Sequence, residues 1–163
     1  MNTFDSLDIL RVMPQRYPML LVDGVEIAPD SNRCLAFKNI TLNEPCYRHI
    51  VPSTEPQTLA YPLALLAESF GQGAGLLLMQ RGLLDPTCQR SVVVFGEFGE
   101  IDMAGHAYPG DRLRHEIQIG FASSRMATLS GTTWVHDRLI ASYCGVKVFR
   151  ITSASLTPES RDA

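Results

Sequence analysis

The sequence predicts an α+β domain in which a curled antiparallel sheet wraps around one long buried helix. The stretch from Pro62 to Arg81 has a helical pattern that is apolar on nearly every side, and a helix of this kind is buried on every side. Strand-like segments separated by turn residues lie before and after it in the sequence. One sheet cannot cover such a helix completely, so we expect a second chain to complete the core and the protein to be a dimer.

The expected elements follow one another without a repeat or a linker. A short helix over residues 6–13 opens at Ser6 and stops before Pro14. A hairpin with strands at 20–27 and 33–40 follows, and then a loop over 42–61 in which prolines disfavour helix. After the long helix, strands are expected at 91–98, 111–122, 126–135 and 139–151. We therefore predict a single domain over residues 1–151 and a polar, disordered tail over 152–163.

Composition and charge exclude several classes of protein. The 163 residues are 45% hydrophobic and 19% charged, which is typical of one globular domain. The net charge of −3 comes without a basic stripe, so neither nucleic acid nor a membrane surface is an expected partner. The apolar run Leu63–Met79 contains Glu68, Gln72 and three glycines, which makes it too short and too polar to cross a membrane.

The four cysteines, at positions 34, 46, 88 and 144, lie far apart and form no C-x-x-C pair. This spacing fits neither a zinc site nor the dense disulfide framework of a small secreted domain. The N-terminus also lacks the apolar segment of a signal peptide. We expect a cytoplasmic protein with reduced thiols, and we predict no metal and no cofactor.

Glu68 is the most informative residue of the long helix, because a buried carboxylate rarely persists without a partner or a role. A carboxyl group at this place can serve as a general acid. His49 lies in the preceding loop, and a neutral imidazole is a competent base near neutral pH. The free N–H groups at the helix start, those of Leu63 and Ala64, can stabilise a developing oxyanion.

Each of these residues also has an interpretation without catalysis. His49 could be a surface imidazole, and Glu68 could accept a hydrogen bond from loop backbone. Gln72, one helical turn beyond Glu68, either orients that carboxylate or forms a helix-to-helix hydrogen bond at a dimer interface. The other histidines, His106, His115 and His136, are expected to be structural or exposed.

Several short motifs follow one another in a characteristic order. They are Pro14 with Arg16–Pro18, Leu20–Asp23, Lys38–Pro45, and Pro109–Asp111 with Leu113. In this order they resemble the hot-dog-fold 3-hydroxyacyl-[acyl-carrier-protein] dehydratases of fatty acid synthesis, the FabZ type. The resemblance extends over about residues 8–151 and implies a hot-dog fold, in which a curled sheet surrounds a central helix.

The resemblance also implies a catalytic pair. His49 takes the position of the family's histidine, Pro62 that of the proline at the helix entry, Glu68 that of the acid and Gln72 that of the glutamine that follows. In the family the histidine and the acid come from different subunits of a dimer. This chain departs from the family pattern in its loop, which is longer and lacks the Phe-Pro-Gly after the histidine, and in Leu63, which replaces a glycine.

The activity implied by the resemblance is dehydration of a carrier-bound 3-hydroxyacyl thioester to a trans-2-enoyl thioester, in fatty acid or polyketide and polyene biosynthesis. His49 would be the base and Glu68 the acid, while Leu63, Ala64 and Gln72 would bind the oxyanion or the substrate. The expected partners are an acyl carrier protein with a phosphopantetheine-linked acyl chain and a second hot-dog subunit, identical or different. Two alternatives stay open: a non-catalytic or acyl-chain-binding subunit of a heterodimer, and a hot-dog thioesterase.

Overall fold

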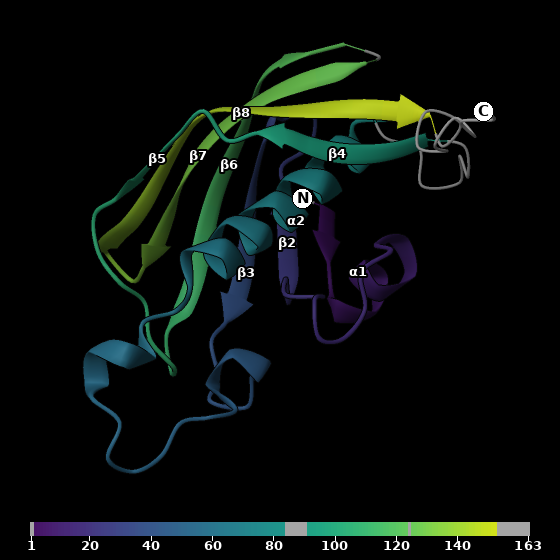
Figure 1. The fold of residues 1–163 in the computed structure, drawn as a ribbon. Helices are drawn as coiled ribbons and strands as arrows, with labels where there is room; N and C mark the ends of the chain where they lie inside the picture. The colour runs from purple at the N-terminus through teal and green to yellow at the C-terminus, as the bar shows by residue number, and fades with distance from the viewer. Residues whose placement is uncertain (1, 84–90, 124, 153–163) are drawn as a thin grey trace, which may run out of the picture.

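The computed structural model describes residues 2–83, 91–123 and 125–152 (Figure 1). Its helices are α1 (Ser6–Val12) and α2 (Leu63–Gln80), with short 3-10 turns at Pro45–Tyr47 and Pro56–Leu59. Its strands are β1 (Asn2–Phe4), β2 (Gly24–Ile27), β3 (Arg33–Asn39), β4 (Ser91–Glu97), β5 (Glu100–Met103), β6 (Arg112–Ala122), β7 (Met126–Val135) and β8 (Arg138–Thr152). The predicted tail over 152–163 lies outside the described residues, apart from Thr152 at the end of β8.

All the strands belong to one antiparallel sheet that curls around α2. The strand order is β1-β2-β3-β6-β7-β8-β4, and β5 also pairs with β8. Figure 1 shows α2 lying in the hollow of this sheet, with β4 and β8 arching over it and β3 and β6 running beside it. The predicted fold class, a curled antiparallel sheet around one long helix, is confirmed.

Small residues let α2 lie close to the sheet. A Cβ atom added at Gly73 would stand 2.5 Å from the Cβ atom of Ala36 on β3 and 2.8 Å from Cδ1 of Ile117 on β6. Real Cβ atoms do not approach other carbons so closely, so glycine is required for this helix-to-sheet distance.

Helix α2 is the centre of the hydrophobic core. Most of its residues from Leu66 to Leu78 are buried, including the large side chain of Phe70. By length and composition alone the stretch Pro56–Gln80 is apolar enough to cross a membrane, so the prediction that this region is too short and too polar was wrong. However, 61% of its apolar window is buried inside the protein, and its position in the sheet accounts for its composition.

The first strand of the predicted hairpin is shorter than expected. It begins at Gly24 and not at Leu20, because the N–H groups of Leu21 and Val22 bind the side chain of Gln72 and not a neighbouring strand. Asp23 then joins the two strands, since its Oδ2 accepts hydrogen bonds from the backbone and side-chain nitrogens of Asn39 at 2.6 and 3.0 Å. Asp23 and Asn39, which belong to two of the short motifs, thus meet across the hairpin.

Helix starts and two short strands also differ from the prediction. Asp5 and not Ser6 caps α1, because its carboxylate accepts hydrogen bonds from the next turn. Pro62 precedes α2 as its N-cap and is not its first helical residue. Strands β1 and β5 were not predicted, since each has only three or four residues and no clear alternation.

His115 forms a buried polar network between the sheet and α2. It is fully buried, with Nε2 3.0 Å from Ser69 Oγ on α2 and Nδ1 2.7 Å from Thr133 Oγ1 on β7. Thr133 Oγ1 in turn lies 3.1 Å from the hydroxyl of Tyr143 on β8. Burial lowers the pKa of His115 to about 3, so the ring is neutral at ordinary pH and one hydroxyl must donate to it. His115 is structural, whereas His106 and His136 are exposed.

Replacement of His115 by glutamine should remove a pH-dependent part of the stability. Below about pH 6.5 the unfolded chain binds a proton at this ring, whereas the native ring stays neutral down to about pH 3. The free energy of unfolding therefore decreases as the pH is lowered from 7. The difference in unfolding free energy between wild type and His115→Gln should shrink by roughly 2 kcal/mol from pH 7 to pH 5. Urea titrations at one protein concentration measure it. The exposed His136→Asn is the control, and an equally large change in that control would contradict the account.

Candidate active site

A cavity of about 330 Å³ lies between the loop after β3, the segment before β2 and the first turn of α2. Its lining consists of Pro18, Met19, Leu21, Glu44, Pro45, Cys46, Arg48, His49 and Leu65. The walls are mainly apolar and the few polar groups converge from the loop, which is typical of a small-molecule site. Burial, and then the charge of Glu44, raises the pKa of Cys46, so its thiol is neutral.

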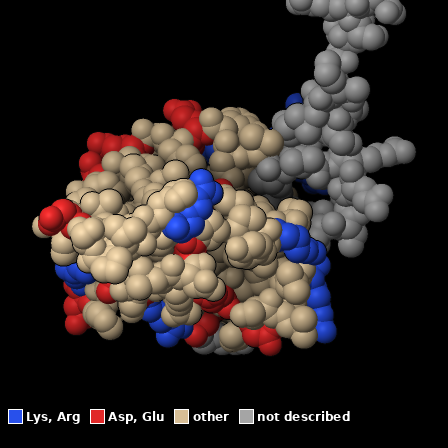
Figure 2. All heavy atoms as spheres, turned by 60° about the horizontal axis from the view of Figure 1, so that its bottom comes forward, with Lys and Arg blue, Asp and Glu red and all other residues tan. Residues whose placement is uncertain are grey.

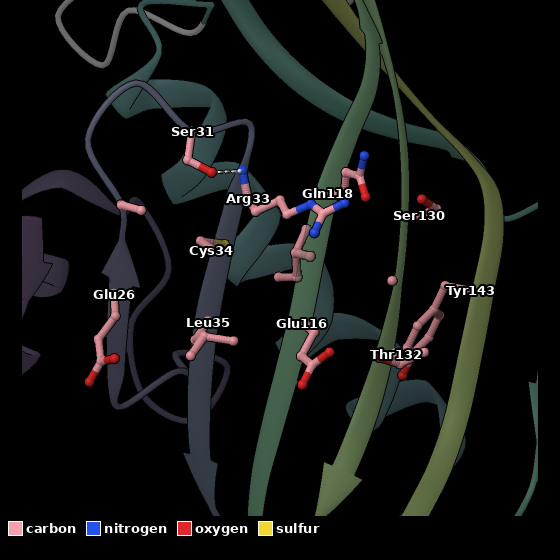
Figure 3. Close-up of a pocket in the computed structure, with 13 residues that line it drawn as sticks. Glu26, Ser31, Arg33, Cys34, Leu35, Glu116, Gln118, Ser130, Thr132 and Tyr143 are labelled. Atoms are coloured by element: carbon pink, nitrogen blue, oxygen red, sulfur yellow. Dashed lines mark hydrogen bonds between the residues drawn. The ribbon is translucent and has the colours of Figure 1, made fainter. Parts of the chain in front are cut away.

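A larger hollow of about 680 Å³ lies elsewhere and contains none of the predicted site residues. Figure 3 shows its labelled side chains, among them Leu35, Glu116 and Thr132, projecting from strands with α2 behind them. Leu35 and Glu116 face each other across β3 and β6, and their chain neighbours Ala36 and Ile117 contact α2. Because side chains alternate along a strand, this hollow lies on the outer face of the sheet.

His49 lies on the exposed loop that follows the Pro45–Tyr47 turn and contributes to the smaller cavity. Its Nε2 accepts a hydrogen bond from Arg48 Nε at 2.9 Å. That contact fixes the proton on Nδ1 of the neutral ring, since Nε2 acts as the acceptor. In the single chain, therefore, Nε2 can act as a base only after Arg48 moves away.

Glu68 is half-buried on α2, and Gln72 holds its carboxylate. Gln72 Nε2 donates to Glu68 Oε1 at 2.8 Å and to the carbonyl of Met19 at 2.6 Å. Gln72 Oε1 accepts from the N–H groups of Leu21 and Val22 at 2.9 and 3.2 Å. Both donors and both acceptor sites of this amide are used, so its orientation is determined by its partners. All these contacts lie within the chain and connect Glu68 to a wall of the cavity.

The start of α2 offers two free backbone donors. The N–H groups of Leu65 and Leu66 bind the carbonyl of Pro62, and no side chain caps the helix. Within the described residues, the N–H groups of Leu63 and Ala64 have no acceptor, and both residues are exposed. Their direction and the helix dipole suit a negatively charged oxygen.

One chain alone does not bring the predicted pair into contact. Within the described part of the chain, no hydrogen bond or ion pair joins His49 to Glu68. His49 lines the cavity directly, whereas Glu68 reaches the cavity wall only through Gln72 and Met19. A catalytic pair made of these two residues therefore requires a rearrangement or a second chain.

Sequence reasoning missed Arg48 and the polar cluster around Glu44. Arg48 could have been noticed because it directly precedes the histidine. Among the partners of Glu44, Lys38 and Thr41 lie in the same short motif, whereas Tyr61 is 17 residues away and no spacing pattern indicates that contact. Figure 2, which brings the loop-rich end of the molecule forward, shows a mostly uncharged surface in which residues of both signs are interspersed.

Known structures with similar architecture place the fold among the hot-dog proteins. A chain of the dehydratase heterocomplex ApeI:P from Xenorhabdus doucetiae matches with a TM-score of 0.63 at 13% identity, covering 91% of this chain and 93% of the other. A probable thioesterase from Bartonella henselae matches with a TM-score of 0.55 at 13% identity, covering 74% and 92%. At this identity the likeness defines the fold alone.

Sequence relatives define the family. No model of a known protein family matches the chain. However, the FabZ 3-hydroxyacyl-[acyl-carrier-protein] dehydratase of Aromatoleum aromaticum is 32% identical over 135 residues, which cover 83% of this chain and 90% of the relative. The FabZ dehydratase of Thermotoga petrophila is 31% identical over 131 residues, covering 80% and 86%. The chain belongs to the FabZ family of 3-hydroxyacyl-[acyl-carrier-protein] dehydratases.

Gln72→Leu should destabilise the protein by about 2–4 kcal/mol, because it leaves the buried N–H groups of Leu21 and Val22 without acceptors. Urea unfolding measures the loss. Gln80→Leu, at the exposed end of the same helix, is the matched control and should change stability by less than about 0.5 kcal/mol. Equal effects of the two substitutions would show that the amide of Gln72 is not a structural partner of this segment.

Proposed function

We propose that the protein is a 3-hydroxyacyl-[acyl-carrier-protein] dehydratase, which converts a carrier-bound 3-hydroxyacyl thioester into a trans-2-enoyl thioester and water. The names of its sequence relatives support this activity. The observation in the structure that carries the proposal is Glu68, whose carboxylate is held by Gln72 on a helix with two free amides at its start. The reacting unit is the single domain over residues 1–151, acting in fatty acid or polyketide synthesis in the cytoplasm.

The proposed reaction uses a base, an acid and an oxyanion site. His49 removes a proton from C2 of the acyl chain, and the electron pair of that C–H bond forms the C2=C3 double bond. The C3–O bond breaks, and Glu68 gives a proton to the leaving hydroxyl, which departs as water. Meanwhile the N–H groups at the start of α2 stabilise negative charge on the thioester oxygen. Proton transfer from His49 back to Glu68, directly or through solvent, restores the enzyme.

A second hot-dog chain completes the proposed site. The exposed position of His49 in the single chain supports this, because a base for C2 deprotonation needs a partly enclosed site. Strand β4 ends the sheet, and among the described strands it pairs only with β8. Val94 on β4 and Phe149 on β8 are large apolar side chains that remain 38% and 37% exposed. We infer that two chains pair at this edge and that His49 of one chain then acts with Glu68 of the other.

The substrate is proposed to arrive on an acyl carrier protein, as the names of the relatives indicate for those proteins. The phosphopantetheine arm would enter the cavity beside His49, where apolar Met19, Leu21 and Leu65 line the wall. Entry of the arm would also displace Arg48 from His49 Nε2 and free the ring nitrogen for catalysis.

A non-catalytic subunit of a heterodimer is the second candidate. Arg48 occupies the acceptor nitrogen of His49, and Leu63 stands where the family has a glycine. Leucine keeps its N–H but does not allow the backbone angles that glycine permits. The heterocomplex named for the Xenorhabdus doucetiae neighbour also supports pairing between different hot-dog subunits. In that arrangement, this chain would hold the acyl chain or complete the partner's site.

Intact-mass spectrometry of a carrier protein loaded with a 3-hydroxyacyl group tests the proposal. Wild type should remove one water, whereas His49→Gln and Glu68→Gln should slow the reaction at least about 100-fold, since each removes one proton-transfer group. The exposed His136→Asn is the matched control and should retain the wild-type rate.

Other results of this experiment would favour one of the alternatives. Release of the free acid would indicate a thioesterase. An unchanged carrier protein with acyl chains of several lengths would favour the non-catalytic subunit, and activity that returns on adding a second hot-dog protein would favour a catalytic heterodimer.

A further inference from the structure

A buried ion pair lies beneath the loop that carries His49. Lys38 at the end of β3 donates from Nζ to Glu44 Oε1 at 2.9 Å and to the carbonyl of Asn39 at 2.7 Å. The side chains of Lys38 and Glu44 are only 8% and 12% exposed. A pair removed from water to this extent is costly unless its geometry is good and its remaining polar atoms are satisfied. Such a pair therefore requires an explanation beyond surface charge.

The carboxylate of Glu44 also binds two further groups. Oε1 accepts from the N–H of Thr41 at 3.1 Å, at the beginning of the loop. Oε2 accepts from the hydroxyl of Tyr61 at 3.0 Å, at the end of the loop. Burial, and then the charge of Glu44, raises the pKa of Tyr61, so the phenol stays protonated and donates at every working pH.

These contacts connect the two parts of the proposed site that come from one chain. Glu44 precedes His49 in the loop and lines the same cavity. Tyr61 directly precedes Pro62, the N-cap of α2, and so lies next to the free amides of Leu63 and Ala64. Tyr61 is itself held from the other side, because its N–H binds the carbonyl of Ala107 at 2.8 Å. Two contacts therefore join the beginning of this loop to its end: Glu44 accepts from Tyr61, and the hydroxyl of Tyr47 donates to the carbonyl of Leu59 at 3.1 Å. Of the two, the contact of Glu44 reaches the residue next to the N-cap of α2.

We propose that Glu44 is a positioning residue: paired with Lys38, it holds Tyr61 and thereby sets the place of the His49 loop relative to the first amides of α2. This inference rests on the proposed dehydration. It goes further in assigning a role to a residue that touches neither the reacting carbon atoms nor the leaving hydroxyl. We call the contacts of Glu44 with Lys38 and Tyr61 the tether. A small displacement of a base from its target atom lowers the reaction rate strongly, so loss of the tether should lower turnover more than it weakens substrate binding.

Tyr61→Phe is the most informative variant, because it removes only the hydroxyl and keeps the buried ring. We expect kcat to fall about tenfold and KM to change less than about twofold. In Glu44→Gln, kcat should fall at least as far. The kcat of the double variant should be no lower than that of Glu44→Gln alone, because Tyr61 acts through Glu44. Asp8→Asn, which breaks the exposed pair with Arg11, is the control and should keep the wild-type rate.

Hydrogen exchange provides a readout that does not depend on activity. In Tyr61→Phe, the backbone amides of residues 48–58 should exchange faster, whereas those of the core of α2 should not. A rate equal to wild type in Tyr61→Phe, a double variant in which the losses multiply, or a rate loss that merely follows the loss of folded protein would overturn the tether. If wild type dehydrates no carrier-bound substrate, the proposed function fails. Unchanged loop exchange in Tyr61→Phe would then overturn the tether as well.

Discussion

The amide of Gln72 determines how α2 is rotated within the sheet, and the candidate site depends on that rotation. An apolar helix in an apolar groove has few directional contacts, so polar contacts must fix its orientation. Gln72 provides them on one side through Met19, Leu21 and Val22. The buried contact between Ser69 and His115 provides them on another side. With the helix held at both places, Glu68 and the free amides at the helix start have defined positions.

The site is then built from two parts of different rigidity. Glu68 lies on a helix whose rotation is fixed by several hydrogen bonds. His49 lies on a loop that is held by the contacts of Glu44 with Thr41 and Tyr61 and by the contact of Tyr47 with Leu59. Leu63, directly after Pro62, carries one of the two free amides of the proposed oxyanion site.

Periodicity predicted the elements that follow regular patterns, and long-range contacts explain the rest. The all-round apolar α2 and the alternating β6 were predicted from their own residues. The late start of β2 could not be predicted, because it results from a side chain 50 residues away in sequence that takes the place of a neighbouring strand. The contact of Glu44 with Tyr61 spans 17 residues of irregular loop and leaves no periodic signal. His49 and Glu68 could be named from the motifs, but a single chain does not determine their distance.

The central claim is that His49 of one chain acts with Glu68 of another, and mixing two inactive variants tests it most directly. His49→Gln and Glu68→Gln chains would be unfolded together and refolded at equal concentration. If the site is shared, about half of the dimers contain one chain of each kind, and each of these has one site with both native residues. About a quarter of the wild-type dehydration rate should then return. A mixture no more active than either variant alone would contradict the shared site.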